Sequence, residues 1–269
     1  TAIGFLLAFG FARLVGPTIG LRDDASQRSF AICAGICNYG YIPLPLAQQF
    51  YPAAEVTLIL HNVGVDIALW SVGLMIVSGG SPTESPATGR PTSDDDDSVE
   101  STSEESRPVK TPWWRALISP PMLAVVIALA IKATGITAWV PAPITSAATL
   151  MGACTIPMGL LLSGAIMIDC LKEADWSTGR GTILSALLLR LGLFPILMLG
   201  FGVIAISSLE MRQVMMLEAA MPAAIFPIIL VRLYDKDTTT ALHVVLSTSF
   251  IGIITIPMWL GIGSWWLGV

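Results

Sequence analysis

The sequence predicts an all-α, polytopic membrane protein: about eight membrane-spanning helices are seen of an expected ten, forming inverted five-helix repeats with crossed broken helices. Three observations lead to this prediction: an apolar composition, apolar runs of bilayer length and an internal repeat. The 269 residues are 54% hydrophobic and 12% charged, with a mean hydropathy of +0.75. Soluble domains carry about 25% charged residues, so most of this chain is expected to face lipid.

Apolar runs separated by proline, glycine and charged residues define the predicted spans. They lie near residues 1–16, 29–50, 54–78, 117–134, 143–168, 181–206, 211–232 and 239–267. Between the third and fourth spans, a segment rich in Ser, Thr, Pro, Asp and Glu cannot bury enough apolar area to become ordered. The predicted organisation is therefore an N-terminal repeat (1–78), a disordered acidic linker (79–112) and a C-terminal repeat (113–269).

Charged residues indicate the orientation of the chain. The linker holds 8 of the 19 acids and 3 of the 14 bases, so the rest of the chain has 11 of each and the net charge of -5 does not describe the substrate. If the loops alternate sides, Lys132 and Arg212 lie on one side. The other side, cytoplasmic by the positive-inside rule, collects Arg13, Arg22, Arg28, Arg115, Lys172, Arg180, Arg232 and Lys236. We therefore expect a cytoplasmic linker, with both chain ends outside.

An offset of 184 residues superimposes the two halves of the chain without a gap. Pro43 then falls on Pro227, Phe50 falls on Tyr234, and spans one to three coincide with spans six to eight. Each counterpart is five spans away, an odd number, so matching helices cross the membrane in opposite directions. Two spans of the second repeat lack a counterpart, which predicts two further helices before Thr1. The alternative is that hydrophobic helices superimpose by chance with shared prolines.

Two spans at matching positions carry polar or helix-breaking residues near their centres. One contains Cys37–Pro45 and the other contains Met221–Pro227. Proline removes a backbone donor and clashes with the preceding turn, so both spans should break or kink near the membrane midplane. Such breaks survive in lipid where protein or a watery cavity satisfies the freed backbone groups; the alternative is a pair of packing kinks. The candidate binding residues are Asn38, Tyr39, Gly40, Pro43, Pro45, Pro222 and Pro227.

Ionisable residues inside the spans are the second group of candidates, because a buried charge costs at least about 2.5 kcal/mol in a bilayer. Glu218, one turn before the predicted break, is the leading candidate for coupling to a proton or cation. Asp66, Asn62 and His61 form a set able to bind a cation or pass a proton, although His61 alone is also typical of a buried structural histidine. Arg190 could attract an anion or tie an acidic partner to the scaffold.

The remaining residue patterns predict no metal site, cofactor or catalytic residue. Cys33 and Cys37 share a helix face, but no histidine or second thiol pair accompanies them. The run Asp94–Asp97 lacks the glycine and spaced ligands of a calcium loop. The sequence contains neither a phosphate-binding Gly-Lys-Ser/Thr loop nor a nucleophile elbow, which disfavours an ATP-driven pump or a hydrolase. We expect no nucleic-acid partner.

Three stretches resemble the auxin efflux carrier family of permeases. They are Asn38-Tyr39-Gly40 with Pro43-Leu44-Pro45, Ala219-Ala220-Met221-Pro222 leading to Tyr234-Asp235, and Thr248 through Ile256-Pro257-Met258-Trp259. The resemblance covers the chain except the linker and implies ten helices in two inverted repeats, similar also to bile-acid symporters. It aligns Asn38, Pro43 and Pro222 with the family's crossover residues and implies an organic-anion substrate such as indole-acetate or a dicarboxylate. The chain departs from many members at Ala223, Ala224 and Phe226, where they carry small polar residues.

The leading functional hypothesis is a secondary carrier that moves a small organic anion across the cytoplasmic membrane by alternating access. Its expected partners are membrane lipid, the anion and a coupling proton, with a homodimer left open. One alternative is a sodium-coupled organic-anion symporter. Another is a non-transporting sensor or scaffold that signals through the linker, which would lose its function on deletion of Pro82–Val109. A third is an inactive chain without two of its helices.

Overall fold

The computed structural model describes residues 1–79, 120–135 and 141–269. Within these ranges the chain is helical almost throughout and contains no β-strand. Apart from Gly79, the predicted linker lies outside the described residues. The prediction of an all-α protein is confirmed for the described part of the chain.

Five helical stretches are long and apolar enough to cross a membrane. They coincide with predicted spans one, three, five, six and eight. Two of them are continuous through short π-helical segments, which locally add a residue to a helical turn. The five are α1 (Ala2–Ile19); η1 (Pro52–Ala54) with α4 (Glu55–Ala68), η2 (Leu69–Gly73) and α5 (Leu74–Ser78); α8 (Ala142–Glu173); α9 (Arg180–Ala186) with η4 (Leu187–Leu193) and α10 (Phe194–Ala205); and α13 (Thr238–Leu267).

The second and seventh predicted spans are broken, as the sequence predicts. The second consists of α2 (Asp24–Gly35) and α3 (Pro43–Phe50), and the seventh of α11 (Leu209–Ala220) and α12 (Phe226–Leu233). The main chain is extended at Ile36 and Met221, directly after α2 and α11. Met221 precedes a proline, whose ring disfavours helical geometry in the residue before it. Proline lies in the first turn of both α3 and α12, where its missing N–H is tolerated.

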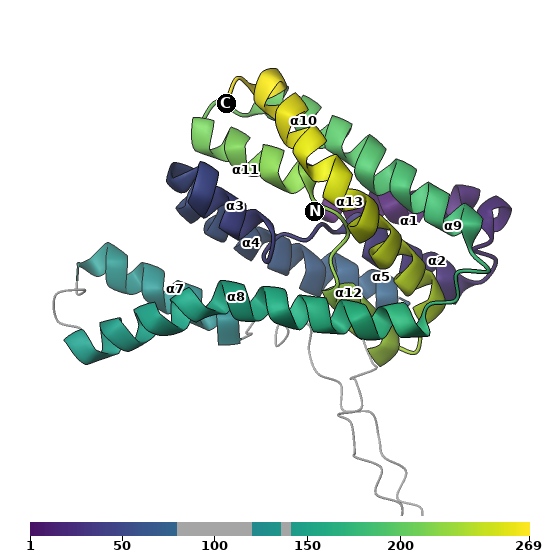
Figure 1. The fold of residues 1–269 in the computed structure, drawn as a ribbon, viewed down its shortest axis with the longest axis horizontal. Coiled ribbons are helices and arrows are strands. Elements are labelled where there is room, and N and C mark those ends of the chain that lie inside the picture. The colour runs from purple at the N-terminus through teal and green to yellow at the C-terminus, as the bar shows by residue number, and fades with distance from the viewer. Residues whose placement is uncertain (80–119, 136–140) are drawn as a thin grey trace, which may run out of the picture.

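The core lies around α2, which is buried from Phe30 to Gly35. Helix α1 packs closely against it, because a Cβ atom on Gly35 would lie 2.7 Å from the Phe5 ring. Helix α7 (Pro120–Thr134) and the long helix α8 lie along one edge of the bundle (Figure 1). Most described side chains of α8 are exposed, and α8 carries a mostly apolar sequence that suits contact with lipid. The number of eight spans and the inverted repeat remain predictions.

The loops that carry most of the basic residues gather at one end of the bundle. Several long-range contacts join the helix ends next to these loops. They are Arg28 with the Ile76 carbonyl, Arg232 with Glu173, the close approach of Gly181 to Ile19, and the hydrogen bond between His243 Nε2 and the Asp175 carbonyl. The assumption that successive loops alternate sides is therefore consistent with the arrangement of these helix ends.

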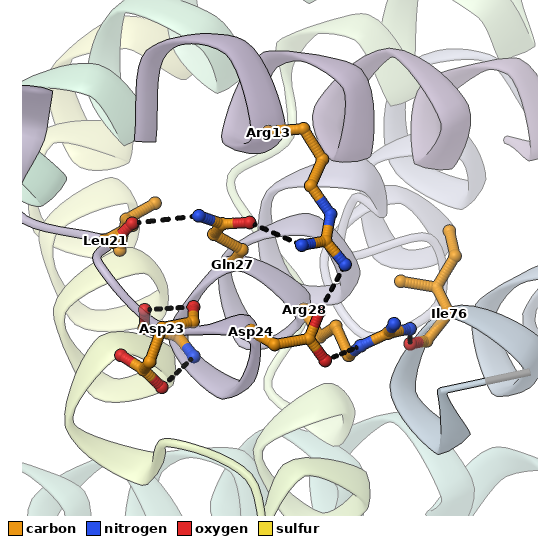
Figure 2. Close-up of polar contacts among 8 residues, drawn as sticks. Arg13, Leu21, Asp23, Asp24, Gln27, Arg28 and Ile76 are labelled. Carbon is orange, nitrogen blue, oxygen red and sulfur yellow. Dashed lines mark hydrogen bonds and ion pairs between the residues drawn. The ribbon is translucent and has the colours of Figure 1, made fainter. Parts of the chain in front are cut away.

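A polar cluster joins α1, α2 and α5 at this end (Figure 2). Asp24 forms ion pairs with both Arg13 and Arg28. Arg13 Nη1 also donates to Gln27 Oε1 at 2.9 Å, and Arg28 Nη1 donates to the Ile76 carbonyl at 2.6 Å. The hydrogen bond from Arg28, followed by that from Arg13, lowers the pKa of the Asp24 carboxyl, which lies outside the predicted span. Asp24 thus connects two arginines from different helices.

Replacing Asp24 with asparagine should lower the free energy of unfolding in detergent by about 0.5–1 kcal/mol, because each exposed ion pair contributes only a few tenths. Since the pKa of Asp24 is lowered in the folded state, its contribution is present at neutral pH and is lost as the pH falls below its ordinary value of 3.8. Asp169→Asn removes a largely exposed pair with Lys172 and should have almost no effect. Equal unfolding temperatures for the two variants would contradict this account.

Candidate functional site

The two breaks lie against each other and pair through their main chains. The Asn38 N–H donates to the Pro222 carbonyl at 2.8 Å, and the Ala224 N–H donates to the Ile36 carbonyl at 3.3 Å. This is an isolated antiparallel bridge. The pairing satisfies backbone groups that two broken helices would otherwise leave unpaired in an apolar environment. We call the non-helical segments 36–42 and 221–225 the crossover.

Two residues outside the crossover hold its second segment in place. Thr248 of α13 accepts a hydrogen bond from the Ala223 N–H at 3.3 Å. Arg190, with 2% of its surface exposed, donates to the carbonyls of Met221 at 3.1 Å and Glu218 at 3.3 Å. Of the two roles expected for Arg190, these contacts fit a scaffold role, although through backbone carbonyls rather than a carboxylate. Among the described residues it forms no ion pair.

The Glu218 carboxylate lies at the edge of the crossover and is 1% exposed. Its Oε1 atom is 3.0 Å from His61 Nδ1, and its Oε2 atom accepts a hydrogen bond from the Cys37 thiol at 3.5 Å. The His61 side chain is 24% exposed, so it is the more accessible member of the pair. This contact joins α4 to α11. Among the described residues, no group of three or more His, Cys, Asp and Glu side chains could hold a metal ion.

The predicted set on α4 is divided between two partners. His61 faces Glu218, whereas Asp66 and Asn62 both bind Tyr39. The Tyr39 hydroxyl donates to Asp66 Oδ1 at 2.6 Å, and Asn62 Nδ2 donates to the Tyr39 carbonyl at 2.9 Å. Asn62 Oδ1 is buried and has no hydrogen-bond partner within the described ranges. The α4 side chains therefore contact the first segment of the crossover, through Tyr39, and the end of α11, through Glu218.

A cavity of about 280 Å³ opens beside the crossover. Among the described residues, no charged side chain lines it. Asn38 and Pro222 are the candidate binding residues in its wall, whereas Tyr39, Gly40, Pro43, Pro45 and Pro227 lie in the crossover or in the first turns of α3 and α12 without lining it. The lining residues are Asn38, Tyr41, Ile42, Leu160, Ser163, Gly164, Met167, Pro222, Ile225, Ser249, Phe250, Ile253 and Ile256.

Comparison with known families decides the class of this protein. A family model described as "Membrane transport protein" matches residues 1–260. The chain belongs to the auxin efflux carrier family of membrane transport proteins. No curated protein and no solved structure shows significant similarity to it. The resemblance inferred from the sequence motifs is confirmed, and this auxin efflux carrier family member is a multi-pass membrane transporter.

The carrier's cavity also includes residues that the sequence did not indicate. Ser163 and Gly164 come from α8, Ser249 comes from α13, and Tyr41 comes from the crossover. The Tyr41 ring packs directly over α8, since a Cβ atom on Gly159 would lie 2.5 Å from it. Isolated serines and glycines are common in membrane helices, so no local pattern marks these positions. Only the packing of α8 and α13 against the crossover brings them together.

Proposed function

We propose that the protein is a secondary active transporter that moves a small organic anion by alternating access, binding it in the cavity beside the crossover. The observation that carries this proposal is that the residues preceding the first turns of α3 and α12, Ile42 and Ile225, both line the cavity. The N-terminus of a helix bears a partial positive charge. Two such ends opening into one cavity without charged side chains favour an anion.

The lining favours an anion with one charge and an apolar body. Asn38, Tyr41, Ser163 and Ser249 provide the polar side chains, and the other lining residues are apolar or lack a side chain. A volume of about 280 Å³ is at the lower end of the range for small-molecule pockets. The second charge of a dicarboxylate would have no charged partner in the cavity wall, and burying such a charge is costly.

Glu218, together with His61, is the proposed coupling group. Glu218 is buried in the last turn of α11. The buried side chain of Arg190, from η4, reaches the same end of this helix. While Glu218 is ionised the two charges offset each other, and protonation of Glu218 leaves a net positive charge that favours a bound anion. His61 is the partly exposed group in contact with the Glu218 carboxylate. A proton can therefore reach Glu218 through the imidazole.

Uptake into proteoliposomes tests this function. The purified protein would be offered labelled phenylacetate, indole-3-acetate, malonate and succinate, with and without an inward proton gradient and with and without sodium. The proposal predicts uptake of the two monocarboxylates, stimulated by the proton gradient and unaffected by sodium. Sodium-dependent uptake would favour the symporter alternative, for which the unpartnered Asn62 Oδ1 atom is the supporting observation. No uptake of any of the four compounds would contradict the proposal.

The orientation and assembly are part of the proposal. The end of the bundle with the basic loops would face the cytoplasm by the positive-inside rule, so the acidic linker would also be cytoplasmic. Exposed apolar side chains on the spanning helices would contact lipid or a second copy of the chain. Protease digestion of sealed vesicles that cleaves the linker only from the cytoplasmic side is the result expected for this orientation.

A further inference from the structure

Tyr39 is held at both of its polar ends by one face of α4. Its hydroxyl donates to Asp66 Oδ1 at 2.6 Å, and its carbonyl accepts from Asn62 Nδ2 at 2.9 Å. Asn62 and Asp66 are four residues apart, so their side chains project from adjacent turns of the helix. The Tyr39 ring also packs against the hydrophobic core. A single helix face therefore fixes both the main chain and the side chain of this residue.

Tyr39 directly follows the amide residue that lines the cavity. The Asn38 N–H is bound to the Pro222 carbonyl, and Asn38 Oδ1 accepts a hydrogen bond from the Tyr41 N–H at 3.2 Å. The backbone at Asn38 is thus fixed on one side by its hydrogen bond to Pro222 and on the other by the α4 contacts of Tyr39. Loss of the contacts of Tyr39 with α4 would remove one of these two constraints on the Asn38 amide.

We infer that Asp66 and Asn62 are positioning residues that hold Tyr39 and thereby orient Asn38 toward the bound anion. This inference rests on the proposed function, because it assumes that the anion occupies the cavity. It assigns Asp66 a different role from Glu218. Asp66 accepts the hydrogen bond from Tyr39 during the whole transport cycle, and it does not carry the coupling proton. An amide oxygen can accept from the Tyr39 hydroxyl as a carboxylate oxygen does, so the role requires an acceptor and not a titrating acid.

The test compares Asp66→Asn, Asp66→Leu and Tyr39→Phe in proteoliposomes, with labelled indole-3-acetate as the probe. Glu55→Gln is the control, because it removes a carboxylate at the start of α4 that binds Gln48 rather than Tyr39. Asp66→Leu and Tyr39→Phe should each raise KM about tenfold with little change in the maximal rate, the effect of losing one hydrogen bond to a charged group. Asp66→Asn should rescue KM to within about twofold and keep the wild-type pH profile.

Two results would overturn the inference. The first is an Asp66→Asn carrier that loses its pH dependence or its sodium dependence, since Asp66 would then be a coupling acid or a cation ligand. The second is a Tyr39→Phe carrier with wild-type KM. A double-mutant cycle on the unfolding temperature in detergent tests the contact between Tyr39 and Asp66 independently of transport. The double variant Tyr39→Phe/Asp66→Leu should be no less stable than the less stable of the two single variants. If wild-type protein transports none of the compounds, the proposed function fails, whereas additive losses in this cycle would refute the contact itself.

Discussion

Replacing Arg190 with methionine should lower the free energy of unfolding by about 2–4 kcal/mol, because two buried hydrogen bonds from a charged donor are lost and the Glu218 carbonyl keeps only the Met221 N–H. The acceptors of these two bonds are the carbonyls of Glu218 and Met221, at the end of α11 and the start of the crossover. We expect a lower unfolding temperature in detergent, measured by tryptophan fluorescence, and loss of uptake.

Arg212→Met is the matched control for Arg190→Met. Arg212 also donates to two backbone carbonyls, those of Ile206 at 2.8 Å and Leu267 at 3.1 Å. Because its contacts are only partly buried, water can replace the lost donors, and we expect a loss of about 1 kcal/mol or less. Arg190→Lys should fall between the two, since an ammonium group can still donate to a carbonyl. An Arg190→Met protein as stable as Arg212→Met would show that the hydrogen bonds from Arg190 to the Glu218 and Met221 carbonyls do not stabilise the crossover.

Replacing Glu218 with glutamine should abolish the stimulation of uptake by protons while leaving binding of the anion intact. The amide has the shape of the protonated acid, so the variant should behave at every pH like the protonated carrier. Coupling between two ligands of one protein typically amounts to about 5–150-fold in affinity, and we expect acid stimulation of that order in the wild type. Uptake of labelled indole-3-acetate between about pH 5 and pH 8 measures it.

Glu210→Gln provides the control for this experiment. Glu210 lies in the first turn of the same helix, α11, at the end opposite to Glu218, and its removal should leave the pH profile unchanged. His61→Gln should slow proton-driven uptake without abolishing it, because His61 contacts the Glu218 carboxylate but does not replace it. Glu218→Gln protein that retains the full pH dependence would exclude Glu218 as the coupling acid.

The breaks in the second and seventh spans could be predicted because their causes are local. Proline lacks a donor and restricts the residue before it, and both breaks lie at or just before Pro43 and Pro222. The pairing of the two breaks follows less directly, from the expectation that freed backbone groups in lipid must find partners. The hydrogen bond between Asn38 and Pro222 provides one such partner.

The polar partners could not be predicted in the same way, because they join residues far apart in the chain. The sequence placed Asp66, Asn62 and His61 in one set on the basis of helical spacing, but a rotation along α4 directs His61 to α11 and the other two to Tyr39. Arg190 was expected to face a carboxylate or an anion, and it instead binds carbonyls. Burial cost identifies which residues need partners and leaves the identity of the partners open.

The most direct test of the central claim fills the cavity beside the crossover. Gly164 of α8 lines the cavity and Gly152 of the same helix does not, and a Cβ atom at either position meets no atom within 4 Å. Binding of labelled indole-3-acetate to purified protein would be measured for Gly164→Leu and Gly152→Leu, alongside their unfolding temperatures. The account predicts that Gly164→Leu weakens binding by tenfold or more, on the order of the 1.4 kcal/mol that a few lost contacts represent, while Gly152→Leu binds like the wild type. Equal binding by the two variants would place the substrate elsewhere and contradict the account.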